Sequence, residues 1–147
     1  MHPYPHRYTV QASAGPAGPV ACDSAGLPSL QTTPPPEFDG PPGYWSPETL
    51  LIAAIADCFV LSFRAVARAS KLEWSELTVS VEGVLEKTET GTRFTHYVLK
   101  PRLTLADAAR EALARTVLDK SKRACLVTNS LNGVCDLAPE LLFTAAA

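Results

Sequence analysis

Two cysteines, Cys58 and Cys125, are the residues of this chain whose type and surroundings best suit chemistry. Cys58 interrupts a long apolar run over residues 50–63, and Cys125 follows a short basic stretch over residues 120–123. If the fold brings the two thiols together, they form a dithiol that can reduce an oxidant while it becomes a disulfide. The chemistry indicated is therefore redox chemistry performed by the protein's own side chains.

The local sequence marks Cys125 as the better thiolate candidate of the two. Neighbouring cations and the start of a short helix both favour a charged sulfur, although the same cations also suit the solvated end of the preceding helix. Cys58 has Ala54 and Ser62 four residues to either side, so small side chains leave room for a reactant. Asp57 points about 100° away around the helix and opposes a thiolate only if it reaches the sulfur. Because a thiol in an apolar helix is inert on average, packing explains Cys58 as well as function does.

The other two cysteines, Cys22 and Cys135, fall in predicted strands, where a free thiol behaves as a small apolar side chain and core packing is favoured. The four cysteines form no C-x-x-C pair, and the histidines His2, His6 and His96 are scattered. Structural zinc sites have closely spaced ligand pairs. The sequence therefore predicts no metal site and no cofactor.

Length and charge indicate one domain over residues 1–147 that acts on a small partner. A chain of this size buries roughly two thirds of the surface that its unfolded form exposes. Thirteen basic and fifteen acidic residues give a net charge of -2, which does not favour nucleic acid or an anionic membrane. The first residues lack a secretory signal, and the apolar run over 50–63 is too short to span a bilayer. We expect a soluble cytoplasmic protein, in which structural disulfides are rare.

The first part of the chain, residues 1–33, is predicted to form N-terminal strands. Alternation over 4–12 suggests an opening strand, residues 13–19 a turn, and 20–23 and 30–32 short returning strands. Residues 34–45 form a proline-rich loop, because proline lacks a backbone donor and cannot sustain a helix or a central strand.

A long helix is predicted over residues 46–70. Ser46 suits the N-cap, Pro47 the first helical position, and Glu48 places negative charge in the first turn. The first half of the helix is apolar on nearly every face. We therefore expect it to be buried on several sides, in a core or between subunits.

The rest of the chain is predicted to form a hairpin over residues 77–105, followed by a segment over 106–147 with a helix, the second cysteine and a closing strand. The hairpin turns at 89–91, and Pro101 weakens the end of its second strand. Thr104 is expected to cap the next helix, which ends near Lys120, and Cys125 to open one or two helical turns. This order of elements predicts an α+β fold with a mostly antiparallel sheet.

Three segments together resemble the OsmC/Ohr family of osmotically induced and organic hydroperoxide resistance proteins. They are Ser-Pro-Glu-Thr-Leu-Leu at 46–51, Ala-Ile-Ala-Asp-Cys at 54–58, and Lys-Arg-Ala-Cys-Leu-Val-Thr-Asn-Ser-Leu at 122–131. The resemblance covers nearly the whole chain, including the proline-rich loop. It implies an OsmC-like fold with a long buried central helix, an interlocked homodimer with active sites at its interface, and thiol-dependent peroxidase activity.

The resemblance also implies roles for the two cysteines and reverses their order. Cys58 would be the peroxidatic thiolate and Cys125 the resolving cysteine, with an organic hydroperoxide as substrate and an external dithiol as reductant. An apolar pocket prefers an alkyl or lipid hydroperoxide to hydrogen peroxide, because only the former has a tail that gains by burial. Candidate walls, which are equally typical of an ordinary core, are Phe38, Tyr44, Trp45 and Phe59.

The activation of Cys58 is where this sequence departs from the family. Burial raises the pKa of a thiol unless something opposes it. In the Ohr branch an N-terminal arginine does so, held by a glutamate at the start of the cysteine helix. Glu48 matches that glutamate, although it also serves simply as a first-turn charge. The loop over 13–19, where the arginine is expected, has no basic residue; Arg7 lies within a predicted strand, and Arg64 lies off the Cys58 face.

The missing arginine leaves two other interpretations open. The first is a family member that keeps the dimer and its apolar interface pocket but binds a small hydrophobic ligand without turnover. The second is an inert structural domain, which predicts equally unreactive cysteines and a pocket that retains no ligand.

Overall fold

The protein combines helices with mostly antiparallel strands, which confirms the predicted α+β class. A computed structural model describes residues 2–144. The chain separates into two compact units, residues 1–51 and 52–147, and the boundary falls inside the first long helix, α1 (Pro47–Ala69). Residues 145–147, the end of the predicted closing segment, lie outside the described part.

The first unit contains a three-stranded antiparallel sheet in the order β1-β2-β3. Its strands are β1 (Gln11–Ser13), β2 (Val20–Asp23) and β3 (Leu30–Thr32), so the two short returning strands were predicted correctly. The strand predicted over 4–12 is wrong for most of its length, because β1 begins only at Gln11. Proline at positions 3 and 5 removes donors that a strand ladder needs.

The proline-rich loop is a loop, as predicted, with one short 3-10 turn, η1 (Pro36–Phe38). Gly40 folds back so closely on the carbonyl of Pro34 that a side chain there would collide with it. The Thr33 N–H donates to the Trp45 carbonyl at 3.0 Å. These contacts return the chain to β3 just before α1 begins.

Helix α1 buries a single stripe within one chain. That stripe consists of Ile55, Phe59, Phe63 and Ala67, at the four-residue spacing of one helix face. Other apolar positions stay open, and Leu61 is 53% exposed. The apolar run over 50–63 was predicted to be too short to span a bilayer, but α1 as a whole is longer. By length and composition alone it could cross a membrane, and the core helix of a soluble protein meets the same criteria. Burial on several sides is thus not achieved by the described residues of one chain.

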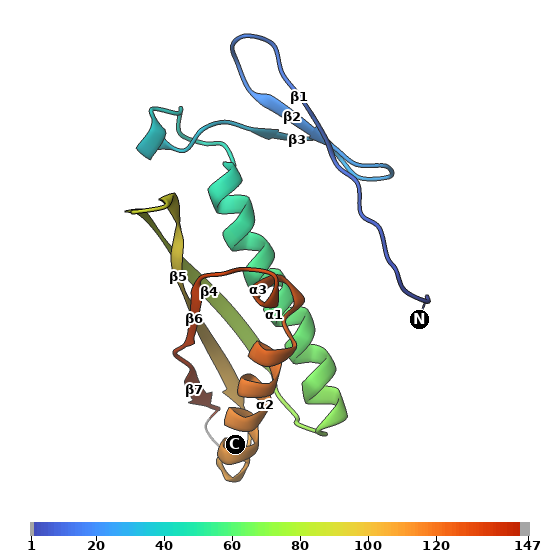
Figure 1. The fold of residues 1–147 in the computed structure, drawn as a ribbon. Coiled ribbons are helices and arrows are strands. Elements are labelled where there is room, and N and C mark those ends of the chain that lie inside the picture. Colours follow the sequence, from blue (N-terminus) through green and yellow to red (C-terminus); the bar gives the residue numbers. More distant parts are fainter. Residues whose placement is uncertain (1, 145–147) are drawn as a thin grey trace. The chain divides into compact units, whose positions relative to one another are not determined.

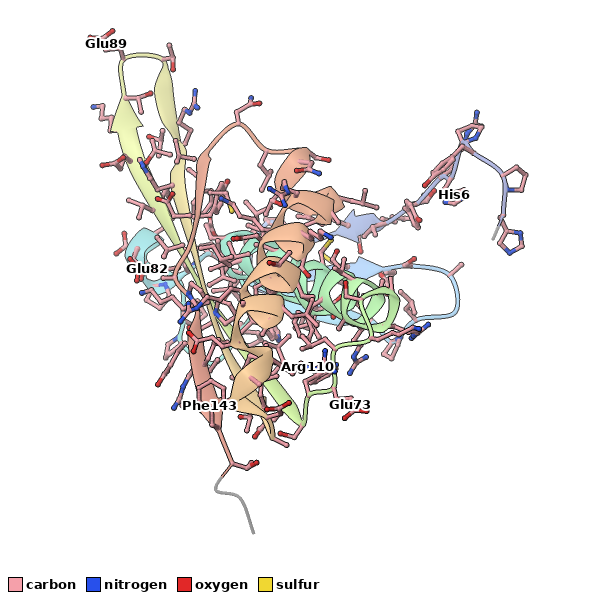
Figure 2. The ribbon with its side chains drawn as sticks, turned by 90° about the horizontal axis from the view of Figure 1, so that it is seen from below. His6, Glu73, Glu82, Glu89, Arg110 and Phe143 are labelled. Carbon is pink, nitrogen blue, oxygen red and sulfur yellow. The ribbon has the colours of Figure 1, made fainter. Side chains whose placement is uncertain are left out.

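The second unit is built on a long hairpin of β4 (Glu76–Thr88) and β5 (Gly91–Leu105). Gly91 has a φ of 121°, a backbone conformation that glycine adopts most readily, so the turn falls where it was predicted. Glu89 marks the tip of this hairpin in Figure 2.

Two short strands complete the sheet by parallel pairing with β5, where one closing strand was predicted. β6 (Val134–Leu137) pairs with residues 96–99 and β7 (Glu140–Phe143) with residues 102–105. Pro101 falls between these stretches and is fully buried. Its missing N–H therefore removes no pairing with β6 or β7. Pro101 was expected to weaken the end of this strand, but β5 continues through it to Leu105.

The helix predicted to start after Thr104 begins later. Thr104 remains in β5, where it pairs with Glu76. The Asp107 carboxylate accepts from the Ala109 N–H at 2.9 Å and opens a 3-10 turn, η2 (Ala108–Arg110). Helix α2 (Glu111–Ala124) follows, and a four-residue helix, α3 (Leu126–Asn129), comes after Cys125. The prediction was wrong because strand pairing outweighed a local capping signal.

Within the second unit, α1 and α2 lie over one face of the sheet (Figure 1). Alternate residues of β5 point into the core, and the β5 residues between them are exposed or half-buried. The fully buried core side chains come from α1, α2 and β5, and include Phe59, Phe63, Leu99, Leu103, Val117 and Leu118. This core fixes the helix that carries Cys58 against the helix that leads to Cys125.

Candidate active site

The start of α1 is set by a reciprocal cap. The Ser46 hydroxyl accepts from the Thr49 N–H at 3.1 Å, and the Thr49 hydroxyl accepts from the Ser46 N–H at 2.8 Å. Each side chain thus satisfies a backbone donor that the first turn of a helix leaves free. The predicted N-cap is confirmed. It fixes the residue at which α1 begins, and so the side of the helix on which each later residue lies.

Cys58 lies beside the buried stripe of α1. Its neighbour Phe59 is fully buried in the core, whereas Cys58 itself is half-buried and Ala54, one turn earlier, is exposed. Asp57 is exposed as well. The sulfur therefore sits at the border between the core and the face of α1 that the chain leaves open.

Cys125 occupies the junction between α2 and α3 and is fully buried. Its N–H donates to the Lys122 carbonyl at 3.2 Å, and its carbonyl accepts from the Asn129 N–H at 3.1 Å and from the Thr128 hydroxyl at 3.1 Å. Its backbone is extended, with φ −69° and ψ 107°, so the two helices are separated by this one residue. The junction holds the thiol in a fixed position inside the protein.

The fold brings the two candidate cysteines together. The Cys58 and Cys125 side chains are close neighbours, since Cys58 contributes to the raised pKa of the Cys125 thiol, and both are free thiols. Two neighbouring thiols can form a disulfide when their Cβ atoms approach to about 3.5–4.5 Å. This juxtaposition links residues 67 positions apart in the sequence.

The expectation that nearby cations favour a Cys125 thiolate is wrong. Burial raises the pKa of the Cys125 thiol above its ordinary value of 9.0, and contact with Cys58 adds to the increase. Hydrogen bonding from the Thr128 side chain and backbone opposes the rise without cancelling it. Arg123 is exposed, and Lys122 acts instead on a different thiol, Cys135. The cations that precede Cys125 in the sequence therefore do not lower the pKa of its thiol.

Glu48 lies in the first turn of α1, ten residues before Cys58. An ideal helix rises roughly 15 Å over that interval, so the two side chains of one helix do not touch. The Glu48 Oε2 atom is buried and has no hydrogen-bond partner among residues 2–144. A buried carboxylate oxygen without a partner is costly, so this position suits an additional donor or cation.

The basic residues considered as activators, Arg7 and Arg64, are both exposed. Arg7 is exposed and lies outside any strand, contrary to the prediction, and Arg64 is exposed on α1. Neither contributes to the shift in the pKa of Cys125. Among the described residues, no group of three or more histidine, cysteine or acidic side chains is arranged to hold a metal ion.

The aromatic residues proposed as pocket walls divide into two sets. Phe59 is fully buried in the core of the second unit. Phe38, Tyr44 and Trp45 belong to the first unit and are about half exposed, at 54%, 49% and 50%.

Two residues near the thiols were missed by sequence reasoning. Thr128 lies three positions after Cys125, a spacing typical of local Ser/Thr hydrogen bonds to the backbone. The hydrogen bond from Thr128 to the Cys125 carbonyl could therefore have been predicted. Cys135 was assigned to core packing, and it does pack against the core. No local pattern indicates that it also lies near Cys125.

Comparison with known proteins identifies the family. A family model described as "OsmC-like protein" matches residues 40–140. The uncharacterised protein YmaD of Bacillus subtilis is 28% identical over 109 residues, which cover 72% of this chain and 73% of YmaD. Among solved structures, an organic hydroperoxide resistance protein OsmC from Legionella pneumophila is 25% identical with a TM-score of 0.75, and the match covers 93% of this chain and 97% of that one.

A further solved structure shares the fold at lower identity. The organic hydroperoxide resistance protein OhrB of Bacillus subtilis is 23% identical with a TM-score of 0.68, and the match covers 92% of this chain and 98% of that one. The predicted resemblance is thereby confirmed, and the chain belongs to the OsmC-like family.

Proposed function

We propose that the protein is a thiol-dependent peroxidase that reduces organic hydroperoxides to alcohols. The observation that carries the proposal is the proximity of the Cys58 and Cys125 side chains, both of them free thiols. Membership of the OsmC-like family, with similar solved structures named organic hydroperoxide resistance proteins, supports the same chemistry.

In the first step the Cys58 thiolate attacks the distal oxygen of the peroxide. The O–O bond breaks, the alkoxide leaves and takes up a proton as the alcohol, and Cys58 becomes a sulfenic acid. Cys58 suits this role because it is half-buried at the edge of the core, whereas Cys125 is fully enclosed. The raised pKa of Cys125 also favours its resting as a neutral thiol.

In the second step the Cys125 sulfur attacks the Cys58 sulfenic acid. An S–S bond forms, and the hydroxyl leaves with a proton as water. The proximity of the two side chains favours resolution within one chain. An external dithiol then reduces the Cys58–Cys125 disulfide by exchange and is itself oxidised to a disulfide.

We infer that the site is completed by a second copy of the chain. Helix α1 leaves apolar positions such as Leu61 open, and the Glu48 carboxylate has an oxygen without a partner among the described residues. A homodimer that covers α1 would enclose Cys58 in apolar surroundings and favour alkyl hydroperoxides over hydrogen peroxide. Because Glu48 and Cys58 of one helix are too far apart, Glu48 of one copy is proposed to hold a cation that favours the Cys58 thiolate of the other copy.

The test is dithiol-dependent turnover of tert-butyl hydroperoxide by the parent protein and by Cys58→Ser. We expect activity in the parent and none in Cys58→Ser, with Cys22→Ser as a matched control that retains parent activity. Mass spectrometry after one equivalent of peroxide should show loss of two hydrogens and a Cys58–Cys125 cross-link. A parent protein whose thiols stay unmodified would reject the enzyme and favour a dimer that binds a small hydrophobic ligand.

A further inference from the structure

A third thiol, Cys135, lies close to the Cys125 junction. It stands in β6 opposite Tyr97 of β5 and is half-buried, with one side against the core. It also lines a pocket with a volume of about 410 Å³. The other residues that line this pocket are Asp119, Lys122, Arg123, Thr128 and Asn129.

The pocket is built from the residues on either side of Cys125. Lys122 and Arg123 precede it at the end of α2, and Thr128 and Asn129 follow it in α3. A hydrogen bond joins the two sides, since the Asn129 side-chain amide donates to the Arg123 carbonyl at 2.9 Å. The pocket therefore lies beside the junction that holds the buried Cys125, and Cys135 of β6 lines it.

We propose that Cys135 is a third redox cysteine, which exchanges disulfides with Cys125 and carries reducing equivalents from the pocket to the buried pair. This inference rests on the proposed function. The Cys135 thiolate attacks the Cys125 sulfur of the Cys58–Cys125 disulfide, so a Cys125–Cys135 bond forms and Cys58 leaves as a thiolate. A dithiol entering the pocket then reduces the new disulfide to two thiols and becomes a disulfide itself.

The relay would let an external reductant reach a disulfide whose own sulfur at Cys125 is inaccessible. Cys125 is fully buried, so an external thiol cannot approach its sulfur. Cys135 lines an open pocket with the two cations Lys122 and Arg123 and one carboxylate, Asp119. A reducing thiol that carries a negative charge would be attracted to this pocket.

The Lys122 cation favours the reactive form of Cys135. Burial raises the pKa of the Cys135 thiol above its ordinary value, and the positive charge of Lys122 opposes that rise. A cation in the pocket thus promotes the thiolate that disulfide exchange requires.

The first experiment isolates the Cys125–Cys135 pair without peroxide. The full chain carrying Cys58→Ser and Cys22→Ser is equilibrated with oxidised and reduced glutathione, and free thiols are then alkylated. No lysine or arginine lies between Ala124 and Ala147, so both cysteines fall in one tryptic peptide. We expect that peptide to lose two hydrogens. The same protein with Cys135→Ser added should show no such loss.

The second experiment follows the relay during turnover. With tert-butyl hydroperoxide, Cys135→Ser should form the Cys58–Cys125 disulfide at the parent rate, while dithiothreitol-dependent turnover falls at least about tenfold because intramolecular exchange is lost. Cys22→Ser, a half-buried strand cysteine, should turn over like the parent.

The two experiments separate this inference from the proposed function. An unchanged mass for the peptide from Ala124, together with parent turnover in Cys135→Ser, would overturn the relay even if peroxide oxidises Cys58. A parent protein that does not react with peroxide would overturn the proposed function, and the glutathione experiment would still decide whether Cys125 and Cys135 exchange.

Discussion

The terminal methyl group of Ile52 occupies the space that a side chain would need at Gly83, where α1 meets β4. The Phe94 ring closes the other side of the same space, with its nearest atom 3.1 Å from the position of an added Cβ. The helix that carries Cys58 therefore approaches the sheet closely only because position 83 has no side chain. Gly83 thus sets how closely α1 packs against β4.

Substituting Gly83→Ala should destabilise the protein by about 1–3 kcal/mol, because an added methyl group in a packed contact forces Ile52 or the helix to shift. Urea unfolding measures the change. Gly15→Ala is the matched control, since its nearest neighbour would be the Ala17 carbonyl at an ordinary 3.8 Å. Equal stability of the two variants would show that the contact at Gly83 relaxes freely.

Removing the reciprocal cap of α1 should also lower stability. Ser46→Ala is expected to cost about 1 kcal/mol, because the Thr49 N–H loses its acceptor. Thr49→Val removes the acceptor of the Ser46 N–H in turn. Combining the two changes should cost less than the sum of the single effects, since both act on one motif. Thermal unfolding of the three variants checks this, and additive effects would contradict it.

Stability should fall at alkaline pH partly through Cys125. Burial raises the pKa of this thiol above 9.0 in the folded protein, so the folded state retains the proton that the unfolded state releases. The contribution is therefore complete below pH 9 and is lost as the pH rises through the raised value. Cys125→Ala should show a shallower loss of unfolding free energy above pH 9 than the parent.

Urea unfolding between pH 7 and pH 11 measures that slope. Tyr97 and Cys135, whose pKa values burial also raises, are expected to leave part of the slope in place in the variant. Identical slopes in parent and Cys125→Ala would mean that the buried thiol is not responsible.

Charge on the open face of α1 should break the proposed dimer. Leu61 is 53% exposed in the single chain, so Leu61→Glu is tolerated by the fold but would bury an unpaired carboxylate in a subunit interface. Analytical ultracentrifugation should give the mass of two chains for the parent and for the control Leu61→Met, and of one chain for Leu61→Glu. A parent protein that sediments as one chain would contradict the interface.

Features encoded by local pattern were predictable from the sequence. The cap at Ser46, the long helix and the turn of the hairpin near Gly91 all depend on neighbouring residues, and all three occur where expected. The strand predicted from Tyr4 onward failed because alternation alone does not supply a partner strand. The helix expected after Thr104 failed because that residue is held by pairing with β4 and β7.

The site was less accessible to local reasoning. Nothing in the residues around Cys58 or Cys125 specifies that the two side chains meet; only the family resemblance indicated the pair. The charge state of Cys125 was misjudged because burial, a property of the folded chain, outweighs the cations that precede it in sequence. Cys135 near Cys125 is likewise a product of the parallel pairing between β5 and β6.

The break in pairing opposite Pro101 divides the edge of the sheet into two pieces that need not open together. Because β6 and β7 pair with separate stretches of β5, we expect β7 to open without β6. Local opening of this kind is visible as unequal amide hydrogen exchange. Release of β7 would then leave β6, the strand that carries Cys135, paired with β5.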